Sequence, residues 1–141
     1  MIVGDTYDVG SPARQSDTVY RLGTVTDSQL RWLYASCDGL IAASYEDFGL
    51  TPVEAHAHGK PVLALRHGGY LETVIEGVNG IFFDEVRASS IAARLSEFRR
   101  LKFDSDAVKE TAQRFSLDHF ITSLRSIVLE EPLCRAPSSQ V

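Results

Sequence analysis

The stretch that decides the fold runs from residue 39 to residue 54 and reads GLIAASYEDFGLTPVE. Its first part, residues 39–43, is short and continuously apolar, which is typical of a strand buried in a parallel sheet. Gly49, Thr51 and Pro52 then mark a turn into a helix. This order of strand, turn and helix predicts a site at the carboxyl end of the sheet, where open α/β folds bind their ligands.

Two acids, Glu46 and Glu54, lie on either side of that turn with seven residues between them. We expect Thr51 to be the N-cap of the helix and Pro52 its first residue, so that Glu54 falls in the first turn. Free backbone N–H groups and the helix dipole favour anions there. Two plainer interpretations stay open: Thr51 and Glu54 also fit a capping box, and Glu46 also fits a solvated loop acid.

A second unit of strand, turn and helix follows directly. The helix is expected over residues 51–58 with Gly59 as its stop, and the apolar run 62–65 predicts the next parallel strand. That strand leads into Gly68 and Gly69 at the start of a short helix. Paired glycines let a ligand approach the backbone and expose its N–H groups, although a tight turn requires glycines equally.

The rest of the chain continues the alternation of strands and helices. The expected elements are a strand at the start of the chain, a strand within 19–27, a helix over 30–37 capped by Asp27 or Ser28, a strand at 81–83, and helices at 90–102, over 108–115 and after Asp118. Such alternation predicts an α/β protein with a doubly wound parallel sheet. Residues 5–18 are rich in turn formers and predict a long loop, and the polar tail 131–141 is predicted to be disordered.

Composition and charge exclude several classes of protein. The chain has 141 residues, 44% apolar and 23% charged, which is typical of one globular domain. A net charge of −5 argues against nucleic-acid binding. Cys37 and Cys134 are too few for a disulfide framework. No apolar run has the length of a membrane span and Met1 opens no signal peptide, so we expect a cytosolic protein.

Two further features have plain interpretations. His56 and His58 are two residues apart on the expected helix and point in different directions, which disfavours a metal site. The helix over 90–102 is basic, which indicates a solvated face or a peripheral contact with the inner face of an anionic membrane.

Several motifs lie in register around the two acids. They are Glu46 with Glu54, GKPV at 59–62, GGYLE at 68–72 and GVNGI at 77–81. In this combination residues 44–84 resemble the donor-binding, carboxyl-terminal domain of retaining glycosyltransferases of the GT-B fold, family 4, also described as glycosyl transferases group 1. The resemblance extends to 19–37 and 114–120. It implies a three-layer Rossmann-like domain over residues 1–130.

The resemblance implies a role for each matching residue. Glu46 would be the catalytic residue, lying beside the transferred sugar, holding its hydroxyls and stabilising the charge that develops at the anomeric carbon. Glu54 would accept hydrogen bonds from the ribose hydroxyls. The other donor-binding positions would be Phe48, Gly49, Leu50 and Thr51 at the helix start, Gly68 and Gly69 on the opposite wall, and Gly23 and Val25 against the base.

The resemblance also implies the chemistry. Family members transfer a sugar from a nucleotide-diphosphate donor with retained configuration, usually without a metal, so we expect no metal and no other cofactor. Basic side chains and helix ends neutralise the diphosphate instead. Residues 46–49 with Glu72 and Thr73 are most similar to members that use GDP-mannose, and a UDP-linked donor stays open. The acceptor, whether sugar, lipid or glycan, is unknown.

The chain departs from the family pattern at its start. In complete members a basic pair on the first strand and helix of this domain holds the diphosphate, whereas this chain opens at Met1 with a segment similar to the second strand. We therefore expect a truncated domain, inactive without an amino-terminal acceptor domain. Two alternatives stay open: a non-catalytic nucleotide-sugar binding module that acts with a partner chain, and a regulatory domain of flavodoxin-like fold.

Overall fold

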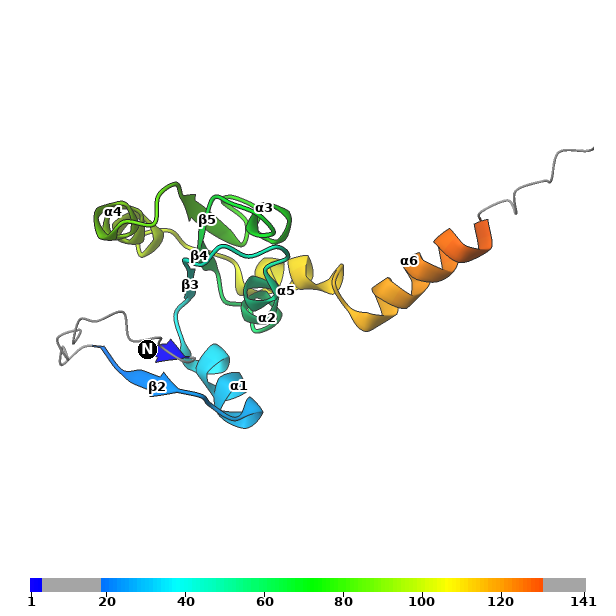
Figure 1. The fold of residues 1–141 in the computed structure, drawn as a ribbon, viewed down its shortest axis with the longest axis horizontal. Coiled ribbons are helices and arrows are strands. Elements are labelled where there is room, and N and C mark those ends of the chain that lie inside the picture. The colour runs from blue at the N-terminus through cyan, green and yellow to red at the C-terminus, as the bar shows by residue number, and fades with distance from the viewer. Residues whose placement is uncertain (4–18, 131–141) are drawn as a thin grey trace, which may run out of the picture. The chain divides into compact units, whose positions relative to one another are not determined.

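The computed structural model describes residues 1–3 and 19–130 (Figure 1). The chain divides into two compact units, the first from Met1 to Cys37 and the second from Asp38 onward. The elements are β1 (Ile2–Val3), β2 (Arg21–Gly23), α1 (Asp27–Ser36), β3 (Leu40–Ala42), α2 (Leu50–Ala57), β4 (Val62–Leu65), α3 (Tyr70–Thr73), β5 (Gly80–Phe83), α4 (Ala88–Phe98), α5 (Ser105–Gln113) and α6 (Leu117–Glu130). The predictions for 5–18 and 131–141 fall outside the described residues.

The first unit consists of two parallel strands, β1 and β2, and the helix α1. The α1 helix starts with a capping box: the Thr26 side chain accepts a hydrogen bond from the Gln29 N–H, and the Gln29 side chain accepts one from the Thr26 N–H at 2.9 Å. The prediction that Asp27 or Ser28 caps this helix is wrong. Thr26 is the N-cap because Gln29, three residues further along the chain, accepts from the Thr26 N–H and so satisfies a second backbone donor.

The second unit contains a three-stranded parallel sheet in the order β3–β4–β5. Leu40 lies beside Val62, and Val62 lies beside Gly80. Every residue of β4 and β5 is buried, which explains their continuously apolar sequences. The strands predicted at 62–65 and 81–83 are thus confirmed. All pairings among the described strands are parallel, as an α/β fold requires, and they fall into two sheets.

Helices cover this sheet on two sides. The α2 helix contacts β3 and β4 and packs against α5, while α4 contacts β4 and β5; in Figure 1, α4 lies on the side of the strands away from α2 and α5. The α2 helix ends before Gly59, whose φ of +71° is the predicted left-handed stop. A Cβ at Gly59 would lie 2.2 Å from Ser105 Oγ, so this glycine also permits the close approach of α5.

A buried polar network joins α2 to the turn before β5. His56 and Asn79 are 1% and 0% exposed. The His56 Nε2–H donates to the Asn79 carbonyl at 3.2 Å, and the Asn79 amide nitrogen lies 3.4 Å from Nδ1. The Asn79 amide also donates to Thr111 Oγ1 of α5 at 2.9 Å. Burial lowers the pKa of His56 to about 4, so the ring is neutral at physiological pH.

The last helix, α6, carries the apolar stripe expected from the sequence. Phe120, Leu124, Ile127 and Val128 lie on it, and their side chains are between 48% and 67% exposed. Over the described ranges 1–3 and 19–130, no helix combines the length and the hydropathy needed to cross a bilayer.

Candidate functional site

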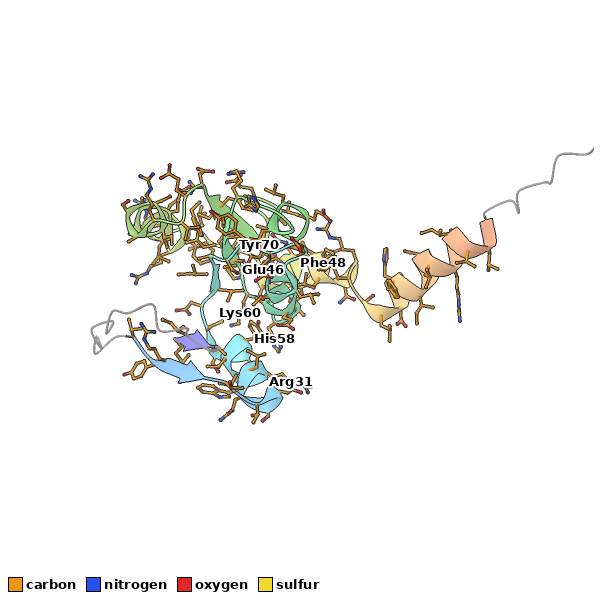
Figure 2. The ribbon with its side chains drawn as sticks, viewed as in Figure 1. Arg31, Glu46, Phe48, His58, Lys60 and Tyr70 are labelled. Atoms are coloured by element: carbon orange, nitrogen blue, oxygen red, sulfur yellow. The ribbon has the colours of Figure 1, made fainter. Side chains whose placement is uncertain are left out.

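The loops that follow β3 and β4 meet at the carboxyl end of the sheet. Because β3 and β4 are parallel neighbours, their outgoing loops leave from the same edge. The Gly69 N–H donates to the carbonyl of Glu46 at 2.9 Å, which joins the two loops directly. Figure 2 shows Glu46 and Tyr70 next to one another at this edge, with Phe48 nearby. The structure therefore brings Glu46 together with the glycine pair.

The glycine pair is required by the protein backbone itself. A Cβ at Gly68 would lie 2.3 Å from the Glu46 carbonyl oxygen, and one at Gly69 would lie 2.2 Å from the Phe48 carbonyl. Gly68 also has a φ of +54°, a backbone conformation that residues with a side chain rarely adopt. The expectation that both glycines expose their N–H groups is wrong for Gly69, because Glu46 already accepts from it.

The start of α2 differs from the expected one. Its N-cap is Gly49, at a φ of +79° and without a side-chain cap, so Leu50 and Thr51 are the first two helical residues. Thr51 as N-cap, Pro52 as first residue and Glu54 in the first turn are therefore wrong. Only glycine fits at this N-cap, because its φ is positive and a Cβ would lie 2.7 Å from Cδ1 of Tyr70.

This earlier helix start changes the interpretation of Glu54. A capping box with Thr51 is excluded, because Thr51 lies inside the helix and not at its N-cap. The Glu54 side chain is exposed on α2. The capping box that the sequence left open for this acid is thereby excluded, and its ribose-binding role stays a prediction.

The carboxylate of Glu46 is held by a hydrogen-bond chain that the sequence did not reveal. Ser44 Oγ donates to Glu46 Oε1 at 3.0 Å and lies 2.9 Å from the Tyr70 hydroxyl. Burial raises the pKa of Tyr70 above its ordinary value, the hydrogen bond to Ser44 opposes this rise, and the charge of Glu46 adds to it. Tyr70 therefore stays protonated at physiological pH and can donate to Ser44.

Phe48 and Leu50 flank the helix start with exposed apolar surface. Phe48 is 49% exposed and meets the ring of Phe115 edge to face, with 5.9 Å between ring centroids. The Arg114 guanidinium lies 4.6 Å from the centroid of the Phe115 ring and donates to the carbonyl of Glu72 in α3. The segment after α5 is thereby tied to α3 beside the site.

Gly23 is the last residue of β2 and Val25 follows it two positions later, both in the first unit. Both are partly exposed, and Gly23 has a φ of +61°, as expected of a tight turn. Their packing against a nucleotide base stays a prediction.

The cation closest in sequence to the glycine pair is held by carboxylates. Arg66, at the end of β4, bonds Glu76 at 3.0 Å and Asp84 at 2.9 Å, and its bond to Glu76 raises the pKa of the guanidinium. Its charge is thus already compensated within the protein. Among the described residues, no group of three or more His, Cys, Asp or Glu side chains could hold a metal ion.

Comparison with protein families gives one match over most of the chain. The family described as glycosyl transferases group 1 matches residues 13–115. A D-inositol 3-phosphate glycosyltransferase from Corynebacterium efficiens is 36% identical over 104 residues, which is 70% of this chain and 24% of that protein. The chain spans about a quarter or less of the length of the first curated relatives it matches.

Solved structures support the same fold. A glycosyltransferase from Rickettsia africae superposes with a TM-score of 0.67 at 26% identity, over 82% of this chain and 33% of that one. Anabaena HepE in complex with UDP and glucose superposes with a TM-score of 0.52 at 31% identity, over 78% of this chain and 28% of that one. These neighbours are GT-B enzymes with Rossmann-like domains, so the predicted fold class is confirmed.

Proposed function

Because the chain belongs to the glycosyl transferases group 1 family, we propose that it is the donor-binding part of a retaining glycosyltransferase that uses a nucleotide-diphosphate sugar. The observation that carries this proposal is the meeting of Glu46 with the Gly68–Gly69 loop at the carboxyl end of β3 and β4. Open parallel sheets bind their ligands at this edge. The proposal keeps the cytosolic location expected from the sequence.

In this proposal Glu46 faces the sugar. Its carboxylate is exposed and anchored by Ser44, so it can accept hydrogen bonds from sugar hydroxyls without first being ordered. A fixed negative charge beside the anomeric carbon also favours the positive charge that develops there during transfer. Tyr70 and Ser44 support this carboxylate, a role that the sequence did not predict.

The start of α2 is the proposed anion site. Backbone N–H groups at the start of a helix have no intrahelical acceptor and favour phosphate. Here those groups belong to Leu50 and Thr51, with Gly49 as the N-cap and Phe48 before it. We assign the diphosphate to this helix start and the ribose hydroxyls to Glu54, which is exposed on the same helix.

The donor itself has two candidates. The sequence around 46–49 favours GDP-mannose, whereas HepE, a structural neighbour, is solved with UDP and glucose. Isothermal titration calorimetry of the chain with GDP, UDP and ADP gives a dissociation constant for each nucleotide and so ranks the three bases by affinity. We expect weak, millimolar binding, because the Arg66 guanidinium beside the glycine pair is already paired with Glu76 and Asp84.

A matched set of variants tests the ribose site. We expect Glu54→Ala to weaken nucleotide binding by roughly 10- to 100-fold, since hydrogen bonds to a charged group contribute roughly 1.5–3 kcal/mol. Glu54→Gln keeps one acceptor oxygen, so its nucleotide affinity should fall less than that of Glu54→Ala. Glu110→Gln, an exposed acid on α5, is the control that should bind as the parent does. Binding by Glu54→Gln and Glu54→Ala equal to that of the parent removes Glu54 from the site.

Transfer requires an acceptor domain, which we propose lies in an amino-terminal half or a partner chain. Adding the upstream half of a related enzyme, fused or in trans, should give transfer of a labelled sugar, and the anomeric configuration of the product, determined by NMR, tests retention. A chain that binds nucleotide sugars but gives no transfer in any such pairing is the non-catalytic binding module.

A further inference from the structure

Tyr70 is a buried side chain that lies under the loop carrying Glu46. It is 1% exposed and belongs to the short helix α3. Its ring packs against Gly49, where a Cβ would lie 2.7 Å from Cδ1, and its hydroxyl lies 2.9 Å from Ser44 Oγ. One side chain thus supports the loop at Ser44 and again at Gly49, the N-cap of α2.

The two hydrogen bonds that link Tyr70, Ser44 and Glu46 have one possible direction of donation. An ionised Glu46 accepts and cannot donate, so the single proton of Ser44 points to Oε1, 3.0 Å away. The Ser44 oxygen then accepts from the Tyr70 O–H at 2.9 Å. The chain of donors therefore starts at a buried hydroxyl and ends at an exposed carboxylate.

The residue before Tyr70 holds the backbone of the same glutamate. The Gly69 N–H donates to the Glu46 carbonyl at 2.9 Å, while Tyr70 reaches the Glu46 side chain through Ser44. Main chain and side chain of Glu46 are thus fixed from two consecutive residues. An exposed glutamate would otherwise sample several rotamers, and fixing one costs conformational entropy.

We propose that Tyr70 and Ser44 are positioning residues that hold the Glu46 carboxylate in the orientation that receives the sugar of the donor. This inference rests on the proposed function, because it requires Glu46 to face the sugar. Neither residue is assigned a contact with the nucleotide. Their loss should therefore weaken the binding of a nucleotide sugar and leave the binding of the free nucleotide diphosphate unchanged.

The test measures that difference on this chain. Dissociation constants for UDP, UDP-glucose, GDP and GDP-mannose are determined for the parent, Tyr70→Phe and Ser44→Ala. In each variant we expect nucleotide-sugar affinity to fall by roughly 2- to 10-fold, the equivalent of one hydrogen bond, with nucleotide affinity constant. The double variant should lose no more than one single variant, since both remove the same chain of contacts. Tyr20→Phe, an exposed hydroxyl in the first unit, is the control.

Two further measurements separate positioning from a general role in folding. Ser44→Thr keeps the hydroxyl and should restore nucleotide-sugar affinity. Carbon-13 NMR of labelled tyrosines should show the pKa of Tyr70 falling in Glu46→Gln and staying constant in Asp47→Asn, because only Glu46 contributes a charge that raises it. If Tyr70→Phe does not fold, Ser44→Ala, an exposed position, gives the same comparison.

The outcomes are distinct. A parent chain that binds none of the four ligands overturns the proposed function, and this inference with it. A parent that binds nucleotide sugars, with both variants binding them equally well, overturns only the positioning role. An equal loss of nucleotide and nucleotide-sugar affinity in both variants also overturns it, since that result means general damage to the site.

Discussion

Lowering the pH should destabilise this protein through one buried ring, His56. The His56 side chain is 1% exposed, and its Nε2–H and Nδ1 are both engaged by Asn79. Burial, the largest cause, lowers the pKa of the ring from 6.5 to about 4; the bond to the Asn79 carbonyl opposes the shift, and the positive charge of Arg114 adds to it. A proton on Nδ1 would also remove the acceptor that the Asn79 amide uses.

The sign and the size follow from linkage. The folded chain keeps the ring neutral while the unfolded chain protonates it, so the unfolded state binds more protons and stability falls as the pH falls. The contribution is fully present above pH 6.5 and is lost towards pH 4. The free energy of unfolding should drop by about 2 kcal/mol between pH 7 and pH 5 and by about 3 kcal/mol at pH 4 from this residue alone.

The assay is urea unfolding of the parent and of His56→Gln, which cannot titrate, at a series of pH values. His56→Gln should be less stable at pH 7, because it satisfies fewer of the Asn79 contacts, and the gap should narrow by about 2 kcal/mol at pH 5. Carboxylates titrate in both proteins and cancel in the difference. A gap that stays constant to within about 0.5 kcal/mol across this range refutes the neutral-ring argument.

Three further substitutions test the packing around the sheet. Gly69→Ala should lower the free energy of unfolding in urea by about 1–3 kcal/mol, because its Cβ would lie 2.2 Å from the Phe48 backbone. The control Gly77→Ala has nothing within 4 Å of its Cβ and adds only the strain of a positive φ. Equal losses of stability in the two variants would contradict the packing argument. Arg94→Ala removes the donor to the Phe82 carbonyl of β5 at 2.7 Å and should lower the free energy of unfolding by about 1–2 kcal/mol. The control Arg87→Ala, at an exposed position, should change it by less than about 0.5 kcal/mol. An Arg94→Ala variant as stable as the parent would refute the bond's contribution. Asn79→Ala leaves several buried groups unpaired and should cost about 3 kcal/mol or more in thermal unfolding; a loss below about 1 kcal/mol would mean that the network relaxes.

The strands and most helices could be predicted because their signal is local. Residues 62–65 are apolar at every position, and burial on both faces gives that pattern and few others. Gly59 likewise marks the helix end through its own backbone preference. The meeting of Glu46 with Gly68 also followed from the sequence, because adjacent parallel strands deliver their loops to one edge.

The start of α2 and the support of Glu46 could not be predicted, because both depend on contacts between separate segments. Thr51 and Glu54 have the spacing of a capping box, yet the helix starts at Leu50, after a left-handed Gly49 that packs against the Tyr70 ring. Ser44 meets Tyr70 across 26 positions of sequence, and nothing local marks either residue. Which loop residues meet depends on the register of the strands that carry them, and the sequence does not specify that register.

The strand order β3–β4–β5 follows the order of the chain, and this has a kinetic consequence. Each strand pairs with the one made just before it, so closing each connection costs little entropy and the sheet can grow one strand at a time as the chain leaves the ribosome. Within residues 1–3 and 19–130, the backbone hydrogen bond that anchors the Glu46 loop comes from Gly69, after β4. The loop should therefore become ordered only after β4 has docked, and an early chain that ends before residue 69 should carry it unfixed.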